Sequence, residues 1–468
     1  MTDSWAAFGA DLHIEPIGPG LRSGLMDALR EAVRTGRLTP GTRLPSSRTL
    51  AADLGIARNT VADAYAELVA EGWLTARQGS GTRVARRADA PGPVGRGRDP
   101  RARPVRRRPA HNLMPGSPDL SAFPRAEWLK ATRRALTAAP DMAFGYDDPR
   151  GRVELRAALA DYLARARGVY ADPERIVICS GFVHGLTLMG KVLRRHKVRR
   201  TAVESYGLDI HWNLLAEAGL TTPCIPVDGL GARTGALGEV PGVGAVLLTP
   251  AHQFPTGVPL HPDRRAAAVD WARSSGGLIL EDDYDGEFRY DRQPVGALQG
   301  LDPERVVYMG TASKSLAPGL RLAWMVLPEE LVEEVCEAKG GFDWMSGVPD
   351  QLTLAEFIAS GAYDRHVRAM RLRYRRRRDE LVEALAERAP GFRVSGIAAG
   401  LHAVLELPEG TEQSVVQAAT WQGLALEKLS RFRHQDAEPG RDGLVIGYGT
   451  PSESGWAGAL DALCRVLP

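Results

Sequence analysis

Residues 306–324 read VVYMGTASKSLAPGLRLAW, an apolar run followed by small and basic residues. The run at 306–309 is short and rich in branched side chains, which predicts a strand that is buried on both faces of a sheet. Similar runs are separated by amphipathic segments, and they lie at 175–179, 201–203, 245–248 and 278–280. Short buried strands that alternate with helices predict an α/β fold with a mostly parallel sheet, covered by helices on both faces.

Reactive side chains follow two of these runs. Lys314 comes after the run at 306–309, with Arg321 seven positions further on, and an acid cluster that contains Asp282 and Tyr284 comes after another. A lone lysine is usually a surface charge, and an acid cluster is commonly a metal site or a solvated turn. Neither interpretation explains why a lysine, a tyrosine and an arginine accompany the acids. Pyridoxal phosphate uses them all, because it needs an amine for its aldehyde, a carboxylate for its ring nitrogen, a donor for its ring oxygen and anion-binding groups for its phosphate.

Each of these residues matches one of the needs of the cofactor. Lys314 would form the imine, Asp282 would pair with the protonated ring nitrogen, and Tyr284 would donate to the ring oxygen. A strand-to-helix turn, a hydroxyl and a guanidinium would hold the phosphate; the residues concerned are Ser180, Gly181, Phe182, Ser313 and Arg321. In this chain order the motifs resemble the fold type I aminotransferases along residues 112–468, with a small C-terminal lobe at about 346–468. The resemblance implies pyridoxal 5'-phosphate as the cofactor and no metal.

Two loops extend the resemblance. Tyr146, in FGYDDPRG, corresponds to the tyrosine that reaches the phosphate of the neighbouring subunit in this fold, which implies a homodimer. The loop at 250–257, PAHQFPTG, resembles the P-x-x-Q-N-P-T-G loop of the aminotransferases. Phe254 stands where those enzymes carry an asparagine that binds the ring oxygen, so this contact is lost or passes to His252 or Tyr284.

Two further departures concern ring stacking and substrate binding. Leu208 ends a segment that resembles E-D-P-G-Y, whose last aromatic often stacks on the cofactor, so Tyr206 or Phe182 would have to replace it. Val445 stands where an arginine clamps the α-carboxylate of the substrate, an interaction of about 1.5 to 3 kcal/mol. Three side chains of the preceding loop could substitute for that arginine: Arg431, Arg433 and His434. We expect a sensor rather than an enzyme, with a transaminase half-reaction still open.

The N-terminal part predicts a winged helix-turn-helix. Apolar residues at helical spacing indicate a first helix that begins near residue 21 and ends near Gly36. The segment at 44–55, LPSSRTLAADLG, places a serine where an N-cap is wanted and a glycine where the helix closes, and a third helix begins in IARNTV at 56–61. Two strands about a Gly-rich tip at 75–84 would form the wing.

The order of these motifs resembles the DNA-binding domain of the GntR family, which we place at residues 14–85. The resemblance implies that double-stranded operator DNA is the partner of this domain. Arg58, Asn59 and Thr60 would lie at the amino end of the recognition helix, where side chains reach base edges. Further contacts, with the DNA backbone and the adjacent groove, would come from Arg43, Ser47, Arg48 and the wing residues Gly79 and Ser80. A winged helix that mediates protein contacts is the alternative.

The net charge of +2 hides an asymmetry along the chain. Residues 1–110 carry 18 arginines, no lysine and 11 acids, a net charge of +7, whereas the remaining residues carry −5. A basic head on an acidic body suggests a polyanion as partner of the head, with a solvated charged face as the alternative. Between the two parts, residues 86–111 are rich in arginine, proline and glycine and lack apolar periodicity, which predicts an extended linker.

The composition excludes several classes of protein. With 44% hydrophobic and 25% charged residues, the chain is typical of a globular protein and not of a disordered one. No apolar run approaches the roughly 18 residues that a membrane span needs, and the first residues carry acid rather than base, so we expect a cytoplasmic protein. The four cysteines are scattered without a C-x-x-C pair, so neither a disulfide framework nor a zinc site is predicted.

A GntR-like winged helix joined to an aminotransferase-like body is the layout of the MocR-type transcription regulators. Among them the chain most resembles the PdxR-like activators of vitamin B6 synthesis, because it lacks an amino-acid clamp. We therefore expect a homodimeric regulator whose effector, pyridoxal phosphate or an amine that reacts with it, shifts the population of two dimer arrangements. The alternatives are a MocR-type regulator of amino-acid metabolism, an aminotransferase that carries a DNA-binding head, and a dimerisation scaffold that has lost the cofactor.

Overall fold

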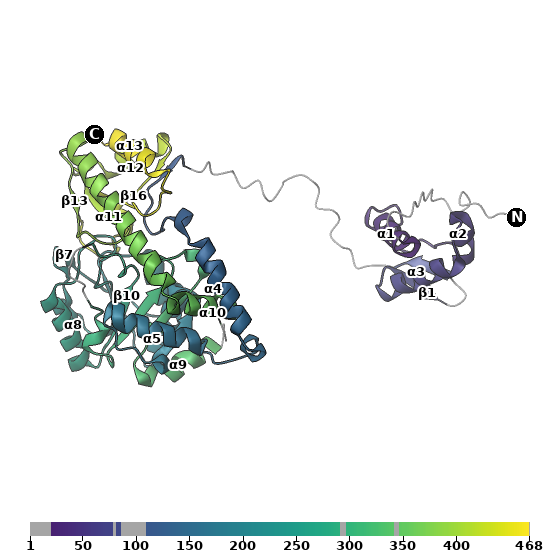
Figure 1. Ribbon diagram of the computed structural model, residues 1–468, viewed down its shortest axis with the longest axis horizontal. Coiled ribbons are helices and arrows are strands. Elements are labelled where there is room, and N and C mark those ends of the chain that lie inside the picture. Colours follow the sequence, from purple (N-terminus) through teal and green to yellow (C-terminus); the bar gives the residue numbers. More distant parts are fainter. Residues whose placement is uncertain (1–19, 78–80, 86–108, 291–295, 341–345, 468) are drawn as a thin grey trace. The chain divides into compact units, whose positions relative to one another are not determined.

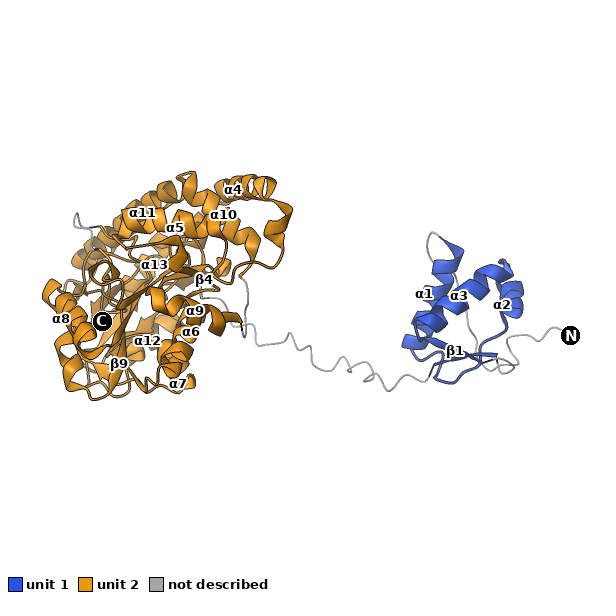
Figure 2. Cartoon of the chain, turned by 90° about the horizontal axis from the view of Figure 1, so that it is seen from below, with its two compact units in different colours: residues 1–107 blue, residues 108–468 orange. Residues whose placement is uncertain are grey.

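The computed structural model describes residues 20–77, 81–85, 109–290, 296–340 and 346–467. The chain divides into two compact units, residues 1–107 and 108–468, which Figure 2 shows in different colours. Each unit has a hydrophobic core of its own. Most of the predicted linker, residues 86–108, lies outside the described residues.

The described residues of the first unit form three helices and a β-hairpin. These elements are α1 (Leu21–Arg34), α2 (Ser47–Leu54), α3 (Arg58–Ala70), β1 (Leu74–Arg77) and β2 (Gly81–Val84), with β1 antiparallel to β2. Ser46 caps α2, because its side chain accepts a hydrogen bond from the backbone N–H of Thr49 at 3.1 Å. Gly55 ends that helix with a φ of 66°, a conformation that favours glycine. The predicted helix-turn-helix and wing are confirmed.

One apolar stripe of each helix closes the core of this unit. Leu25 and Leu29 of α1, Leu50 of α2, and Val61 and Leu68 of α3 are all buried in one cluster. Their helical spacing leaves the opposite stripes, including the first turn of α3, for solvent or a partner.

A mixed sheet of seven strands forms the centre of the second unit in its described part. In spatial order the strands are β4 (Ile176–Cys179), β12 (Ala323–Val326), β11 (Val306–Thr311), β10 (Leu278–Asp283), β9 (Val243–Leu248), β5 (Arg200–Glu204) and β6 (Cys224–Ile225). β12 is antiparallel to both its neighbours, and every other pair in the sheet is parallel. The five predicted runs are strands of this sheet, so the mostly parallel α/β fold is confirmed. β6 and β12 were not predicted, since β6 is too short for a periodic signal and β12 merges with the apolar end of the 306–324 stretch.

Helices cover both faces of this sheet (Figure 1). One face carries α6 (Phe182–Arg195), α7 (Asp209–Glu217) and α9 (Glu329–Gly340), and the other carries α5 (Val153–Arg167), α8 (Pro262–Ser275) and α10 (Val348–Ala359). Val177 and Met309 pack with the first group, whereas their neighbours Ile178 and Tyr308 pack with the second. Since successive residues of a strand point to opposite faces, both faces are apolar and the central strands are buried.

A smaller antiparallel sheet lies in the C-terminal part of the chain. Its strands, in spatial order, are β13 (Val394–Ser395), β14 (Ala403–Glu406), β17 (Gly443–Ile446) and β16 (Glu427–Lys428). The helices α11 (Ala362–Arg388), α12 (Glu412–Trp421) and α13 (Trp456–Val466) share its core. The remaining elements are α4 (Arg125–Ala138), which packs on α10, and two strand pairs, β3 (His111–Asn112) with β15 (Leu424–Ala425) and β7 (Val227–Asp228) with β8 (Gly231–Ala232). None of the helices in the described ranges has the length and apolar character that crossing a bilayer would require.

Candidate functional site

A cavity of about 440 Å³ opens at the carboxyl ends of the parallel strands in the second unit. Glu204 ends β5, Asp282 lies near the end of β10 and Thr311 ends β11, and all three line this cavity. Parallel strands bring their carboxyl ends to one edge of a sheet, which is why residues far apart in the sequence meet here.

Six of the ten residues predicted to hold the cofactor line the cavity: Phe182, Asp282, Tyr284, Ser313, Lys314 and Arg321. The other four, Ser180, Gly181, His252 and Tyr146, are not among its lining residues. The first three of these four contact residues that do line it, and Tyr146 lies on an exposed loop.

Asp282 brings a carboxylate oxygen without a partner to the cavity. The residue is buried, and its Oδ1 forms no hydrogen bond with any described residue. Burial raises the pKa of Asp282 well above its usual range, and the Lys314 ammonium opposes this shift. A buried acceptor without a donor is costly, so a donor from outside the chain would stabilise it. The protonated ring nitrogen of pyridoxal phosphate is such a donor, and the site fits the cofactor at this point.

Lys314 has the environment of a nucleophilic amine. Its Nζ donates a hydrogen bond to the backbone oxygen of Gly116 at 2.5 Å. Burial lowers the pKa of Lys314, although the nearby carboxylates Asp282 and Asp285 raise it. A lowered pKa increases the share of the neutral amine, which is the form that attacks an aldehyde.

The turn between β4 and α6 forms a cradle for an anion. Gly181 has a φ of 92°, and a Cβ at this position would lie 2.3 Å from the Nη2 of Arg321. That Nη2 donates to the backbone oxygen of Ser180 at 2.7 Å. Glycine is therefore required for the guanidinium to approach, and the guanidinium together with the start of α6 offers donors and positive potential to a phosphate.

His252 acts on the cavity through Tyr284. The Tyr284 hydroxyl donates to the backbone oxygen of His252 at 3.0 Å, and the His252 Nδ1 lies 2.8 Å from Oδ2 of Asp285. Burial, reinforced by Asp285, raises the pKa of Tyr284 well above its usual range, so the phenol keeps its proton. His252, Asp285 and His402 also place possible metal-ligand atoms within 4.8 Å of one another, but the first two already bind each other.

Aromatic rings form one side of the cavity. The ring centroids of Phe182 and His211 lie 4.7 Å apart, and both residues line it, as does Leu208. Burial lowers the pKa of His211 to about 4, so this ring is neutral at pH 7. Phe182 is one of the two aromatics that the sequence analysis considered as replacement for the missing stacking ring. His211 was not predicted as a cavity residue, because it belongs to no motif.

Val445 lies among apolar side chains. Val445 is buried in one cluster with Phe254 and Phe432, whose rings pack edge to face with centroids 5.0 Å apart. Of the three loop residues considered as substitute clamps, only Arg431 lines the cavity, and its Nη2 lies 2.8 Å from Oδ2 of Asp209. Two acids that the sequence analysis did not select as functional, Glu204 and Glu427, also line the cavity.

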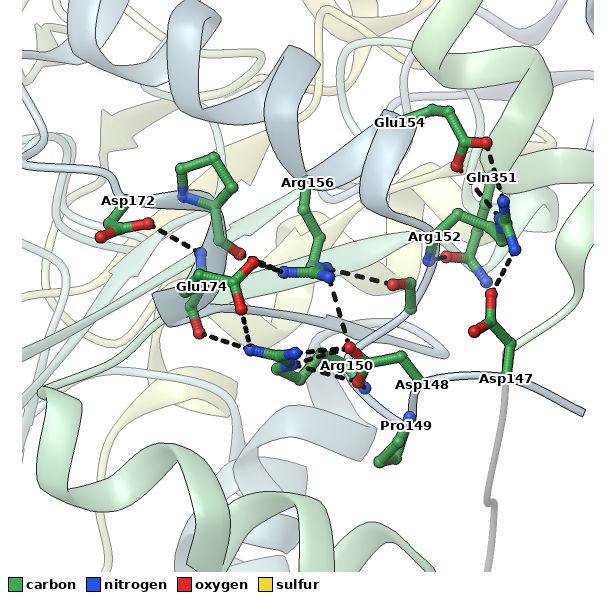
Figure 3. Close-up of polar contacts among 12 residues, drawn as sticks. Asp147, Asp148, Pro149, Arg150, Arg152, Glu154, Arg156, Asp172, Glu174 and Gln351 are labelled. Atoms are coloured by element: carbon green, nitrogen blue, oxygen red, sulfur yellow. Dashed lines mark hydrogen bonds and ion pairs between the residues drawn. The ribbon is translucent and has the colours of Figure 1, made fainter.

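Tyr146 comes just before a segment whose residues form ion pairs with one another. Its side chain is 97% exposed, whereas the residues after it form a network of ion pairs, which Figure 3 shows. Arg150 Nη2 lies 2.6 Å from Asp148 Oδ2, and Arg152 binds both Asp147 and Glu154. Ion pairs therefore link the residues that follow, while the Tyr146 side chain itself is exposed.

The first unit presents arginines at the starts of two helices. Arg58 and Asn59 are exposed in the first turn of α3, with Thr60 half-buried behind them. Arg43 and Arg48 are exposed and Ser47 is half-buried around the start of α2, and none of these arginines forms an ion pair with another described residue. By contrast, α1 carries arginines that bind acids: Arg22 with Glu67, and Arg30 with Glu71. The wing residues Gly79 and Ser80 lie outside the described residues.

Both units match known families. Residues 21–84 match the family described as bacterial regulatory proteins, gntR family. Residues 112–438 match the family described as aminotransferase class I and II.

Similar proteins cover nearly the whole chain. The HTH-type pyridoxine biosynthesis transcriptional regulator PdxR of Corynebacterium glutamicum is 34% identical over 430 residues, which are 92% of each protein. The probable rhizopine catabolism regulatory protein MocR of Rhizobium meliloti is 33% identical over 91% of this chain and 89% of that protein.

Among solved structures, the Pyrococcus horikoshii kynurenine aminotransferase in complex with PMP has a TM-score of 0.68 and 26% identity over 76% of this chain and 90% of that one. The α-aminoadipate aminotransferase LysN of Thermus thermophilus, complexed with N-(5'-phosphopyridoxyl)-L-leucine, has a TM-score of 0.68 and 25% identity over 76% of this chain and 91% of that one.

Proposed function

The chain belongs to the MocR-type regulators of the GntR family, DNA-binding transcription regulators with an aminotransferase-like domain, and on this premise we propose that its cavity binds pyridoxal 5'-phosphate as a signal. The unpartnered Oδ1 of Asp282 carries the proposal, because it lies in a cavity that Lys314 also lines and that only an added donor would complete. When bound, pyridoxal phosphate supplies an aldehyde that condenses with amines and a ring that withdraws electrons from them.

Different residues of the chain would contact different groups of this cofactor. Lys314 would meet the aldehyde, Asp282 would keep the ring nitrogen protonated, and Tyr284, oriented by His252, would donate to the ring oxygen. The remaining contacts would face the ring and the phosphate, and we assign them to Ser180, Gly181, Phe182, Ser313 and Arg321. Two solved relatives, named for PMP and for a phosphopyridoxyl compound, support a B6 compound in this fold.

We assign the regulated genes to vitamin B6 synthesis. The relative from Corynebacterium glutamicum is named for pyridoxine biosynthesis. The buried Val445 and the ion pair that occupies Arg431 also favour the cofactor itself over an amino acid as the effector. A regulator of amino-acid metabolism is the second candidate, and the relative named for rhizopine catabolism supports it.

Two chains would make the complete pocket. Tyr146 is exposed and is followed by residues that ion pairs link to one another, which suits a side chain that reaches the phosphate site of a neighbouring subunit. A homodimer would also present two winged helices to a two-part operator. In each of them, Arg58, Asn59 and Thr60 would read bases, and the backbone and wing contacts would come from Arg43, Ser47, Arg48, Gly79 and Ser80.

The first experiment tests the cofactor. Full-length protein mixed with pyridoxal phosphate should acquire a visible absorbance band that borohydride fixes to the chain, and Lys314→Ala should lack both. Lys339→Ala is unsuitable as a control because Lys339 is buried and binds two backbone oxygens, so Lys197→Ala, at an exposed lysine, serves instead. A band that persists and is still fixed in Lys314→Ala would refute the site.

The second experiment tests the signal. Footprints of the protein on the promoter of pyridoxal-phosphate synthase genes, with and without cofactor, should differ, because the effector shifts the population of two dimer arrangements. Identical footprints would refute the proposed regulation while leaving cofactor binding intact.

Enzymatic turnover is the competing function. Arg431 lines the cavity, and release from Asp209 would free it to clamp a substrate carboxylate. Steady conversion of an amino acid with a keto acid by the loaded protein would establish an aminotransferase.

A further inference from the structure

The small C-terminal sheet and the segment after β16 form one wall of the cavity. None of the residues proposed to hold the cofactor lies in this wall. Glu427 of β16 lines this wall, together with Arg431 and Phe432 from the segment that follows. Because these residues are not needed to hold the cofactor, their charges decide which second ligand fits beside it.

The cations that line the cavity are already engaged. Arg431 pairs with Asp209 at 2.8 Å. Arg321 stands at the proposed phosphate cradle, and Lys314 is the amine proposed to meet the aldehyde. No other lysine or arginine lines the cavity among the described residues.

The two histidines that line the cavity add no positive charge at pH 7. Burial lowers the pKa of His211 to about 4 and moves that of His402 well below its usual range. A carboxylate ligand therefore finds no free cationic group in the described cavity.

Glu427 is a carboxylate without a compensating cation. It is half-buried, its Oε1 accepts a hydrogen bond from the backbone N–H of Lys428 at 3.1 Å, and it forms no ion pair with another described residue. Glu204 is a second acid of the cavity; the hydroxyl of Thr249 donates to it at 2.5 Å, and burial raises its pKa to about 7. Because a pKa near 7 leaves Glu204 partly protonated, Glu427 is the carboxylate beside the proposed cofactor site that has no cation paired with it among the described residues.

The strand register places Glu427 next to Val445. Glu427 in β16 lies directly opposite Val445 in β17, and Val445 lies opposite Val404 in β14. Directly opposite residues of antiparallel strands project to the same face. On this face Glu427 lines the cavity, and Val445 and Val404 are buried beside it. A ligand carboxylate bound next to Glu427 would be desolvated beside a like charge.

We propose that this cavity, beside its cofactor, accepts a primary amine whose far end is cationic, such as an α,ω-diamine, and excludes amino acids. The near amine would face Lys314 and the aldehyde end of the cofactor, and the far ammonium would pair with Glu427. This inference rests on the proposed cofactor, and it names the chemical class of a second ligand that the cofactor-loaded cavity would accept.

Three matched ligands test the selectivity: 1,4-diaminobutane, butylamine and 4-aminobutanoate. They share the reacting amine and four carbon atoms, and at the far end they carry an ammonium, no further group, or a carboxylate. Full-length protein is loaded with pyridoxal phosphate, its visible band is confirmed, and each ligand is titrated by calorimetry. The diamine should bind about tenfold more tightly than butylamine, since a charge-assisted contact is gained, and 4-aminobutanoate should bind most weakly.

Two variants assign the preference to one residue. Glu427→Gln should remove the advantage of the diamine over butylamine and leave the visible band unchanged. Glu409→Gln, at an exposed acid of the same lobe that lies outside the cavity, should retain the advantage.

Several results would overturn the inference. One is tighter binding of 4-aminobutanoate than of butylamine, which would show that Arg431 leaves Asp209 to clamp a carboxylate; Arg431→Gln would then abolish it. Others are an unchanged diamine preference in Glu427→Gln, and no binding of any of the three ligands. If no visible band forms with cofactor, the proposed function fails and this inference with it, whereas a normal band without diamine preference overturns this inference alone.

Discussion

The two units of the chain use arginine in opposite ways. In the second unit, Arg167 is buried, and its Nε lies 2.7 Å from Oδ2 of the equally buried Asp283. In the first unit, Arg43, Arg48 and Arg58 are exposed and form no ion pair with another described residue.

The difference reflects the free-energy cost of removing a guanidinium from water, which is high in the buried core and absent on the surface. A charge taken out of water is tolerated only with a partner, so a buried arginine is paired with an acid, and its removal changes the free energy of unfolding. An exposed arginine without an acid beside it keeps its charge available for a polyanion, so it reports on binding. The same residue type thus has a structural role in the body and offers an accessible positive charge to a polyanion in the head.

Removing a buried arginine should produce the largest effect. Arg167→Met leaves Asp283 buried without its guanidinium partner, and among the described residues the hydroxyl of Tyr308 still donates to it at 2.7 Å. We expect the free energy of unfolding of the second unit to fall by about 3 to 5 kcal/mol, measured by urea denaturation. Arg165→Met, two residues along the same helix, removes an exposed pair with Asp364 and should cost under about 1 kcal/mol. Equal losses in the two variants would contradict the comparison.

A buried acid without an arginine partner should make stability depend on pH. Glu281 is fully buried and accepts hydrogen bonds from the backbone N–H groups of Leu298 and Gln299, at 2.7 and 2.9 Å. Burial raises its pKa from 4.5 to about 7, so between these pH values the folded chain holds a proton that the unfolded chain has released. Its contribution to stability therefore falls as the pH rises through this window, by up to about 1.4 kcal/mol per pH unit.

Glu281→Gln isolates this contribution, because the amide does not titrate. The unfolding free energy of the unsubstituted protein, relative to that of Glu281→Gln, should decline between pH 5 and pH 7 in urea titrations. Parallel pH profiles would show that the carboxyl is ionised throughout and that the body tolerates an uncompensated buried charge.

Removing an exposed arginine of the head should weaken DNA binding without affecting stability. Arg58→Ala should cost about 1 to 3 kcal/mol of operator affinity and relax the preference at one base pair, if the side chain reads a base. The matched control is Arg30→Ala, whose guanidinium pairs with Glu71, and it should leave operator affinity unchanged in the same electrophoretic assay. An unchanged sequence preference with a lower salt dependence would make Arg58 a phosphate contact instead.

The smallest effect should come from a neutral group at a helix start in the head. Ser46→Ala removes the side chain that caps α2 and should lower the stability of the first unit by about 1 kcal/mol, seen as a shift of its thermal transition in the full-length chain. Ser47→Ala, one residue later, removes a hydroxyl that does not cap the helix and is the control. Equal shifts would mean that the cap contributes nothing measurable.

Motif order in the sequence predicted most of the fold, and six of the ten residues that it selected for a cofactor line one cavity. The Ser46 cap, the Gly55 turn and the buried runs depend on contacts close in the chain, so their signals are local. Lys314, Asp282 and Arg321 lie at strand ends, and strand ends of a parallel sheet converge by topology. His211 and Glu427 were not selected as functional, because an acid or a histidine within ordinary amphipathic sequence carries no signal of its own. Glu204 begins the segment that resembles E-D-P-G-Y, in which the recognised contact belongs to the last, aromatic position.

By itself, the sequence determined that this chain joins a winged helix to an aminotransferase-like body, since local periodicity and motif order suffice for both. Only the tertiary structure decided that Arg431 pairs with Asp209, that the Tyr284 hydroxyl donates to the backbone of His252, and that Glu427 lies opposite Val445 in the small sheet. Those relations depend on which side chains of distant segments come within a few ångströms of one another. Such distances arise from the packing of two sheets and their helices, and no spacing along the chain encodes them.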